Sequence, residues 1–209
     1  MPSPVRRACE HLVRRGLRGV WLRGRPPAGP FVWAANHHSW WDPFVAAAVV
    51  GRLGRAPAVL MEQDNLRRFG VARLLGAFGT AQLRQGLHHL RRGRVLIIFP
   101  EGVLRPPARL AALADGAAWY ARRAEIPLCA VAARIVLRGH QAPEAYLDMS
   151  TVDTSAPVAG VTARLEQVLA VQLGELDRSI ATSDPRRPLP GFTPYLEGRR
   201  SWDERWSRD

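Results

Sequence analysis

The sequence contains no lysine, only two cysteines and no long uncharged apolar run. All 30 basic residues of the 209-residue chain are arginines, and they outnumber the 18 acidic residues to give a formal net charge of +12. A complete absence of lysine is typical of a coding bias, so the arginine count alone is no evidence of function. The sign of the charge still favours anionic partners, such as lipid headgroups, nucleic acid or acidic proteins.

The other absences exclude whole classes of protein. Cys9 and Cys129 are isolated, which predicts neither a disulfide framework nor a zinc cluster and fits a reducing compartment. No uncharged apolar run reaches the roughly 18 residues of a membrane-spanning helix. The N-terminus has arginines where a signal peptide has an apolar core. We therefore expect a cytoplasmic protein that does not cross a membrane by itself.

Hydrophobic periodicity divides the chain into three parts. Residues 1–25 predict a basic amphipathic helix, which either packs on the domain or lies in a lipid interface. Residues 30–182 alternate strand-like and helix-like segments, which predicts one α/β domain with a mostly parallel or mixed central sheet flanked by helices. Residues 183–209 are rich in proline and then in arginine and tryptophan, which predicts a linker and a tail.

The same spacing predicts the individual elements. The predicted strands are residues 31–35, 58–61, 80–83, 95–99, 128–135 and 146–149. The predicted helices within the domain are residues 43–50, 65–78, 85–92, 113–124 and 161–180. The strand at 95–99 is continuous and rich in branched residues, as expected for a strand buried on both faces. His88 and His89 lie among arginines in a predicted helix, and we expect them at the surface.

A histidine and a carboxylate lie five positions apart between the first strand and the first helix of the domain. His37 and Asp42 would point to different sides of a continuous helix, because five residues span about 500°, and to opposite faces of a strand. Only a turn brings them together, and polar Asn36, His38 and Ser39 favour a turn. Asp42 can then accept a hydrogen bond from one imidazole nitrogen and leave the other free to take a proton from a substrate hydroxyl.

Both residues also have a structural interpretation. Asp42 directly precedes Pro43, an order typical of an N-cap followed by the first helical residue. A lone His37 would more often be a hydrogen-bonded structural histidine than a base. A metal site of His37, His38 and Asp42 is disfavoured, because adjacent histidines on an extended segment point apart and no further histidine cluster offers a third ligand.

A second motif, Phe99-Pro100-Glu101-Gly102, directly follows the strand at 95–99. Groups just beyond the carboxyl ends of strands line the ligand crevice of α/β sheets, so Glu101 and His37 can face the same crevice. Pro100 makes the turn rigid, and Gly102 permits a backbone geometry or a close ligand approach that a side chain would block. Glu101 is expected to accept hydrogen bonds either from a substrate hydroxyl or from loop amides.

The two motifs together resemble those of the glycerolipid acyltransferase family, the group that contains bacterial lysophosphatidic acid acyltransferases. Asn36-His37-x-Ser39-x-x-Asp42 resembles the His-x4-Asp motif of that family, and Phe99-Pro100-Glu101-Gly102, about sixty residues later, resembles its Phe-Pro-Glu-Gly motif. The resemblance covers roughly residues 30 to 150. It implies a single α/β domain in which both motifs follow strands.

The resemblance also implies a mechanism. His37 would be the general base, oriented by Asp42, and the acceptor hydroxyl would attack an acyl thioester without a covalent enzyme intermediate. Arginines near the crevice would bind the acceptor phosphate. The implied substrate-binding residues are Asn36, Ser39, Arg84, Glu101, Gly102 and Arg105. Neither a metal nor a cofactor is implied beyond acyl-CoA or acyl carrier protein as co-substrate.

The sequence departs from the family pattern at the phosphate-binding arginines. Val103-Leu104-Arg105 replaces the usual threonine and arginine after the second motif, so that the arginine is displaced by one position. Arg84 matches its counterpart only if the spacing is relaxed. These departures concern the acceptor more than the reaction. Another hydroxyl lipid, such as a glycosylated lipid or a different lysolipid, is therefore an alternative acceptor.

We predict an O-acyltransferase that moves a fatty acyl group to a lysophospholipid, 1-acyl-glycerol-3-phosphate, in phospholipid biosynthesis. Its expected partners are this acceptor, the acyl thioester and an anionic membrane surface, with the protein peripheral on the inner face of the cell membrane. The alternatives from another class are a nucleic-acid-binding module and a lipid-binding relative without catalysis. A nucleic-acid-binding module does not explain the positions of His37, Asp42 and Glu101.

Overall fold

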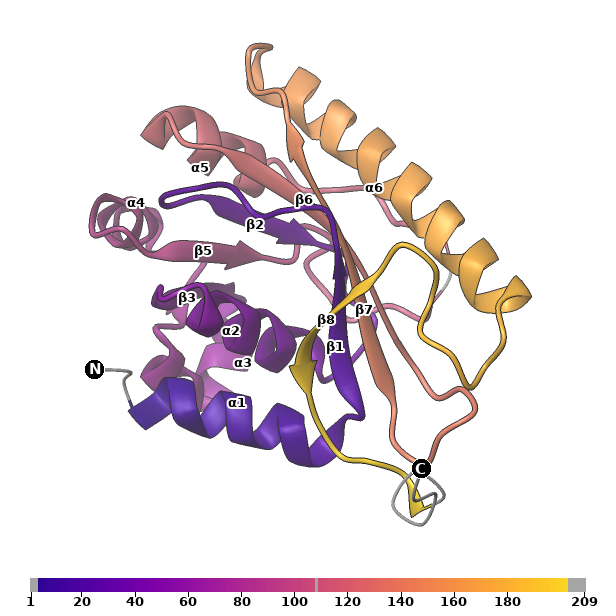
Figure 1. Cartoon of the computed structure of the whole chain (residues 1–209). Helices are drawn as coiled ribbons and strands as arrows, with labels where there is room; N and C mark the ends of the chain where they lie inside the picture. Colours follow the sequence, from indigo (N-terminus) through magenta and orange to yellow (C-terminus); the bar gives the residue numbers. More distant parts are fainter. Residues whose placement is uncertain (1–3, 108, 203–209) are drawn as a thin grey trace.

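A mixed sheet of eight strands forms the centre of the molecule and has helices on both faces (Figure 1). The computed structural model describes residues 4–107 and 109–202. The strands are β1 (Gly19–Arg23), β2 (Val32–Ala35), β3 (Pro57–Met61), β4 (Phe78–Gly79), β5 (Val95–Ile98), β6 (Leu128–Val136), β7 (Glu144–Val152) and β8 (Thr193–Glu197). The helices are α1 (Pro4–Gly16), α2 (Asp42–Arg52), α3 (Gln63–Arg68), the 3-10 helix η1 (Gly70–Leu75), α4 (Leu83–Arg91), α5 (Gly116–Ala124) and α6 (Val158–Thr182). The predicted α/β class with a mixed sheet is confirmed.

The strand order β4-β3-β5-β2-β6-β7-β1-β8 places β2 between β5 and β6. From β4 to β6 every neighbouring pair of strands is parallel, whereas β6–β7 and β1–β8 are antiparallel. β2 and β5 are buried along their whole length, as their apolar sequences predict. Because both strands run the same way, the segments that follow them emerge at the same edge of the sheet. This edge therefore receives both sequence motifs.

Two apolar cores separate the helices into layers. One core joins one face of the sheet to α1 and α2, and the other joins the opposite face to α4, α5 and α6. Figure 1 shows α1 and α2 on one side of the sheet and α5 and α6 on the other. None of the described helices combines the length and the apolar character needed to cross a bilayer.

The N-terminal helix is shorter than predicted. α1 ends at Gly16, and Gly19–Arg23 forms β1 between β7 and β8. The residues from Gly19 to Leu22 are all buried, and such a continuous buried run imitates helical spacing. A Cβ atom at Gly16 would lie 2.0 Å from the Trp41 ring, so close packing on the loop before α2 fixes this position as glycine. The helix predicted over residues 1–25 is therefore wrong beyond Gly16.

Two predicted elements between β3 and α4 are also wrong. The helix predicted at 65–78 is divided into α3 and η1. Gly76 directly follows η1, and its φ of 75° is in the left-handed region that favours glycine. The strand predicted at 80–83 is instead the two-residue β4 at Phe78–Gly79. Both errors lie at the edge of the sheet, where the elements are too short to show a clear periodicity of apolar residues.

The segment predicted as a linker and tail is docked on the domain. Leu189 and Phe192 pack in a third apolar core with Trp21 and Tyr146, and β8 follows as an edge strand. The Arg138 side chain donates hydrogen bonds to the carbonyl oxygens of residues 184 and 187, at 2.7 and 3.0 Å. The predicted arginine- and tryptophan-rich tail is described only as far as Trp202, and residues 203–209 lie outside the described part.

His89 is not at the surface, contrary to the prediction. Both of its ring nitrogens are buried, and neither has a hydrogen-bond partner among the described residues. The ring lies 5.4 Å from that of Phe78, between their centroids. Burial lowers the pKa of His89, and the positive charge of Arg94 lowers it further. The histidine is therefore neutral in the folded protein at neutral pH, while its exposed neighbour His88 has the surface position predicted for both.

His89→Leu should make the protein more stable and its stability less dependent on pH. The folded pKa is lower than the unfolded value of 6.5, so the unfolded chain binds more protons and stability is lost as pH falls below that value. Removal of the unpartnered ring should raise the free energy of unfolding by about 1 kcal/mol at neutral pH. Urea denaturation at about pH 7.5 and about pH 5.5 measures both effects. His88→Leu is the matched control, and an equal gain from both variants would contradict the assignment.

Candidate active site

A turn between β2 and α2 brings His37 and Asp42 together. The backbone N–H of Asp42 donates to the carbonyl oxygen of Ser39 at 3.1 Å, and the Ser39 hydroxyl oxygen accepts from the Trp41 N–H at 3.2 Å. These bonds reverse the chain between the strand and the helix. As a result, His37 Nδ1 lies 2.8 Å from Asp42 Oδ2. The sequence spacing predicts this meeting, and the structure shows the predicted turn.

The Asp42 carboxylate is the most heavily bonded group of the turn. Its side chain is 2% exposed, and Oδ2 also accepts the backbone N–H groups of His38 at 2.9 Å and Ser39 at 2.8 Å. Asp42 is the first residue of α2, Trp41 occupies the N-cap position, and no side chain caps the helix. The interpretation of Asp42 as an N-cap is therefore wrong, because its carboxylate points back into the turn.

One nitrogen of the His37 ring is hydrogen-bonded to Asp42, and the other is free to contact a ligand. Asp42 is a carboxylate that only accepts hydrogen bonds, so Nδ1 must carry the proton that faces it. The other nitrogen, Nε2, has no hydrogen-bond partner among the described residues. The ring stacks on Phe99 with centroids 4.4 Å apart, and its side chain is 22% exposed. This arrangement gives a fixed tautomer whose basic nitrogen is accessible.

Glu101 joins the two loops at this edge of the sheet. Its Oε1 accepts the backbone N–H of His37 at 2.8 Å, and its Oε2 accepts that of Ala111 at 3.1 Å. Of the two roles predicted for Glu101, the structure shows the one with loop amides. The N–H of Arg105 donates to the carbonyl oxygen of His37 at 2.8 Å and ties the loops a second time. Gly102 has a φ of 75°, so backbone conformation is the reason for glycine here.

Asn36 and His38 bind the turn to β6. The Asn36 side chain accepts the Ala133 N–H at 2.8 Å and donates to the Ala133 carbonyl oxygen at 3.2 Å. His38 Nε2 accepts the Ile135 N–H at 3.1 Å. Burial is the main cause that lowers the pKa of His38, so its ring stays neutral and able to accept. Asn36 and Ser39, predicted as substrate-binding residues, have their polar side-chain atoms bonded to backbone.

Residues from four segments line a narrow hollow beside His37. It is lined by Asn36, His37, His38, Glu101, Arg105, Pro106, Arg109, Leu110, Arg134 and Leu173. Arg134 is buried and makes a bidentate ion pair with Asp177, at 2.6 and 2.8 Å. Arg105 and Arg109 are exposed, and neither has an ion pair within the described chain. Arg109 was missed because the long loop after Gly102 has no periodicity that predicts where its side chains lie.

Arg84 does not reach this hollow. It lies in the first turn of α4 and lines a separate groove with Gln82, Gln85 and Trp119. Its predicted role in binding the same acceptor phosphate as Arg105 is therefore not supported by its position. In the described ranges, no group of three or more histidine, cysteine, aspartate or glutamate side chains is arranged to hold a metal ion.

An apolar cavity of about 300 Å³ adjoins the turn on the α1 side of the sheet. Trp40 of the turn and Pro43 of α2 form part of its wall. The remaining lining residues come from α1, α2, β3, η1 and the residues that flank η1, and they are Ala8, Cys9, Leu12, Phe44, Val59, Met61, Phe69, Ala72, Leu74 and Ala77. A cavity with almost purely apolar walls next to a polar turn suits a ligand with a hydrocarbon part.

Comparison with known proteins identifies a family that matches the part of the chain that contains His37, Asp42 and Glu101. The model of a family described as Acyltransferase matches residues 20–134. A lyso-ornithine lipid O-acyltransferase of Pseudomonas aeruginosa is 34% identical over 95 residues, which cover 40% of this chain and 34% of that protein. The match thus spans about a third of the length of this curated relative. The 1-acyl-sn-glycerophosphate acyltransferase PlsC of Thermotoga maritima has the same fold, with a TM-score of 0.61 and 21% identity, covering 76% of this chain and 72% of that one.

Asn36→Ala should destabilise the protein through the loss of its two bonds to Ala133. The free energy of unfolding should fall by about 2 kcal/mol, because a buried N–H and a buried carbonyl group lose their partner. Chemical denaturation measures this change, and Asn65→Ala, at an exposed asparagine, is the matched control. Unchanged stability together with lost ligand binding would instead support the predicted substrate-binding role of Asn36.

Proposed function

The chain belongs to the acyltransferase family, and from this premise we propose that it transfers a fatty acyl group from an acyl thioester to the hydroxyl of a lysophospholipid. The proposed acceptor is 1-acyl-glycerol-3-phosphate, and the proposed process is phospholipid biosynthesis. The observation that supports this function best is the 2.8 Å contact between His37 Nδ1 and Asp42 Oδ2. It sets up a general base at the edge of the sheet, between an apolar cavity and two exposed arginines.

In the proposed reaction, His37 Nε2 removes the proton from the acceptor hydroxyl. The hydroxyl oxygen forms a bond to the thioester carbonyl carbon, and the resulting tetrahedral intermediate collapses with cleavage of the carbon–sulfur bond. The proton on Nε2 then passes to the departing thiolate, so that a thiol leaves and His37 returns to its starting state. No side-chain nucleophile is needed, because the acceptor itself supplies the attacking oxygen.

Asp42 has two effects in this scheme. Its hydrogen bond to Nδ1 holds the tautomer that exposes a basic Nε2, and its negative charge stabilises the imidazolium that forms when Nε2 takes the proton. The backbone N–H groups of His38 and Ser39 fix the carboxylate in position. The stacking of the His37 ring on Phe99 fixes the direction of Nε2. The base is therefore oriented before the acceptor arrives.

The charges beside His37 favour an anionic acceptor headgroup. Arg105 and Arg109 are exposed at the hollow, and guanidinium groups suit the bidentate binding of a phosphate. The carboxylate oxygens of Glu101 are both bonded to loop amides, so this residue is poorly placed to bind an ammonium group. This charge pattern supports a phosphate headgroup over a headgroup with a free amine. A lyso-ornithine lipid, the acceptor in the name of the Pseudomonas aeruginosa relative, is the alternative to test.

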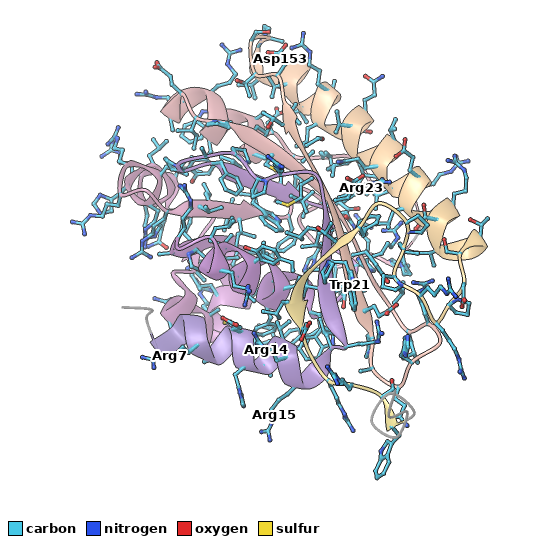
Figure 2. All side chains as sticks on the ribbon, viewed as in Figure 1. Arg7, Arg14, Arg15, Trp21, Arg23 and Asp153 are labelled. Atoms are coloured by element: carbon cyan, nitrogen blue, oxygen red, sulfur yellow. The ribbon has the colours of Figure 1, made fainter. Side chains whose placement is uncertain are left out.

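We further propose that the protein is peripheral on the inner face of the cell membrane. Leu12, Trp40 and Leu74 surround the mouth of the apolar cavity and are 42, 59 and 68% exposed. Figure 2 shows Arg7 and Arg15 extending outward from α1, on the same layer of the molecule. Exposed apolar side chains next to arginines suit the interface of an anionic bilayer. Such contact would let a lipid chain enter the cavity directly.

The function is tested by thiol release from acyl-CoA with different acceptors. Lysophosphatidate should stimulate release strongly, whereas 1-acylglycerol, which lacks the phosphate, should not. His37→Ala should abolish the reaction, and Asp42→Asn should lower the rate by about 10⁴-fold through loss of the correct tautomer. Thermal unfolding checks that both variants fold.

Each alternative has its own result in this assay. Stimulation by a lyso-ornithine lipid but not by lysophosphatidate would keep the reaction and change the acceptor. Acyl transfer that persists in His37→Ala would contradict the proposed base. Absence of transfer from any thioester, in a protein that still binds lysolipid, would make it a lipid-binding relative without catalysis.

Membrane attachment is tested by co-sedimentation with lipid vesicles. The protein should bind vesicles that contain phosphatidylglycerol, and the double variant Trp40→Ser/Leu74→Ser should bind at least about tenfold more weakly, because it removes two large apolar contacts. Leu137→Ser, at a position 66% exposed after β6, is the matched control. Equal binding of the double variant and the control would contradict the proposed membrane face.

A further inference from the structure

Five exposed arginines lie on α4, directly after α4 or on α5, and none has an acidic partner in the described part of the chain. They are Arg84, Arg91, Arg92, Arg122 and Arg123. In the described part of the chain, no ion pair or side-chain hydrogen bond involves any of the five. Many other arginines are paired, as Arg134 is with Asp177 and Arg23 with Asp148.

The composition of the two helices explains this concentration of charge. Neither α4 nor α5 contains an acidic residue. Glu125, just after α5, is the one carboxylate that lines the hollows between them. Because these guanidinium groups are unpaired and close together, they make this face of the molecule positive, which favours the approach of an external anion.

Three of the five arginines line two adjoining hollows between α4 and α5, which share Leu87 and together form a groove. At one end Arg84 lies beside Trp119 and the exposed Leu83, and at the other end Arg91 and Arg123 line a second hollow. Arg84 and Arg91 are about 10 Å apart along the helix axis, since each residue adds about 1.5 Å. The groove thus combines an apolar floor with positive charge at both ends, the combination that suits a helix of an acidic protein.

The Arg84 end of the groove lies at the edge of the sheet that holds His37. α4 follows β4 as α2 follows β2, so the first turn of α4, with Arg84, lies at the carboxyl edge. The strand order β4-β3-β5-β2 places it three strand spacings from β2, about 14 Å. The groove is on the opposite face of the sheet from Trp40 and the apolar cavity. A partner bound there would not compete with a membrane on the α1 side.

We infer that this groove docks an acidic acyl carrier protein that delivers the acyl thioester. The inference rests on the proposed function and names the donor of the reaction. The carrier would set its acidic surface against Arg91 and Arg123, and its flexible thioester-bearing arm would pass Arg84 to reach His37. Free acyl-CoA has no protein surface to place on the far end of the groove, so its use should not depend on Arg91 or Arg123.

The test compares two donors with the same acyl chain and the same acceptor. Arg91→Glu/Arg123→Glu should raise the KM for palmitoyl acyl carrier protein by at least about tenfold, because like charges would face each other across the interface. The kcat/KM for palmitoyl-CoA should stay within about twofold of the wild-type value. Arg178→Glu/Arg200→Glu changes the net charge equally at exposed positions elsewhere and should affect neither donor. The wild-type KM for the carrier protein should also rise with salt.

A binding experiment separates this inference from the proposed chemistry. In His37→Ala, which should be inactive, palmitoyl acyl carrier protein should still bind, and addition of Arg91→Glu/Arg123→Glu should weaken that binding by at least about tenfold. Equal effects of the double variant on both donors, or effects on neither, would overturn the docking site. So would a wild-type protein that uses palmitoyl-CoA alone, or a groove that binds an oligonucleotide but not the carrier. Absence of transfer from both donors would contradict the proposed function, whatever the binding result.

Discussion

The arrangement of this site depends on one buried carboxylate oxygen. Asp42 Oδ2 accepts hydrogen bonds from the His37 ring and from the N–H groups of His38 and Ser39. A buried charge is tolerable only when it is bonded in this way, so the turn must close around it. One of the bonds that hold Oδ2 also sets the tautomer of His37. The folding of the turn and the orientation of the His37 ring therefore depend on the same hydrogen bonds.

Neighbouring segments then hold the turn in place. Glu101 and the N–H of Arg105 join it to the loop after β5, while Asn36 and His38 join it to the backbone of β6. β5 and β6 are the two strands that flank β2, so each clamp acts between adjacent parallel strands. A site supported from both sides by rigid strands keeps its geometry when ligands bind. Most of the polar side chains near His37 make the hydrogen bonds that hold the turn in place.

The surface is divided between different kinds of contact. Apolar side chains surround the cavity on the α1 layer, two exposed arginines lie at the edge beside His37, and five more lie on α4 and α5. Under the proposed function, this separation would let a lipid chain, its headgroup and an acidic carrier protein approach from different directions. It also explains why a net charge of +12 is a poor guide by itself, since its meaning depends on which arginines lack an acidic partner.

The sequence by itself determined the α/β class, the strands that carry both motifs and the meeting of His37 with Asp42, because only a turn satisfies a five-residue spacing. It could not predict the role of His38, because that role depends on the Ile135 amide, almost a hundred residues away. It also could not show that Arg84 and Arg105 line different hollows, because strand order, and not distance along the chain, determines which loops are neighbours. β1 was mistaken for helix since a fully buried strand has no alternation of polar and apolar residues. Spacing along the chain determines which side chains can meet within one turn. The strand order of the sheet determines which backbone groups and charged side chains from distant parts of the chain lie next to that turn.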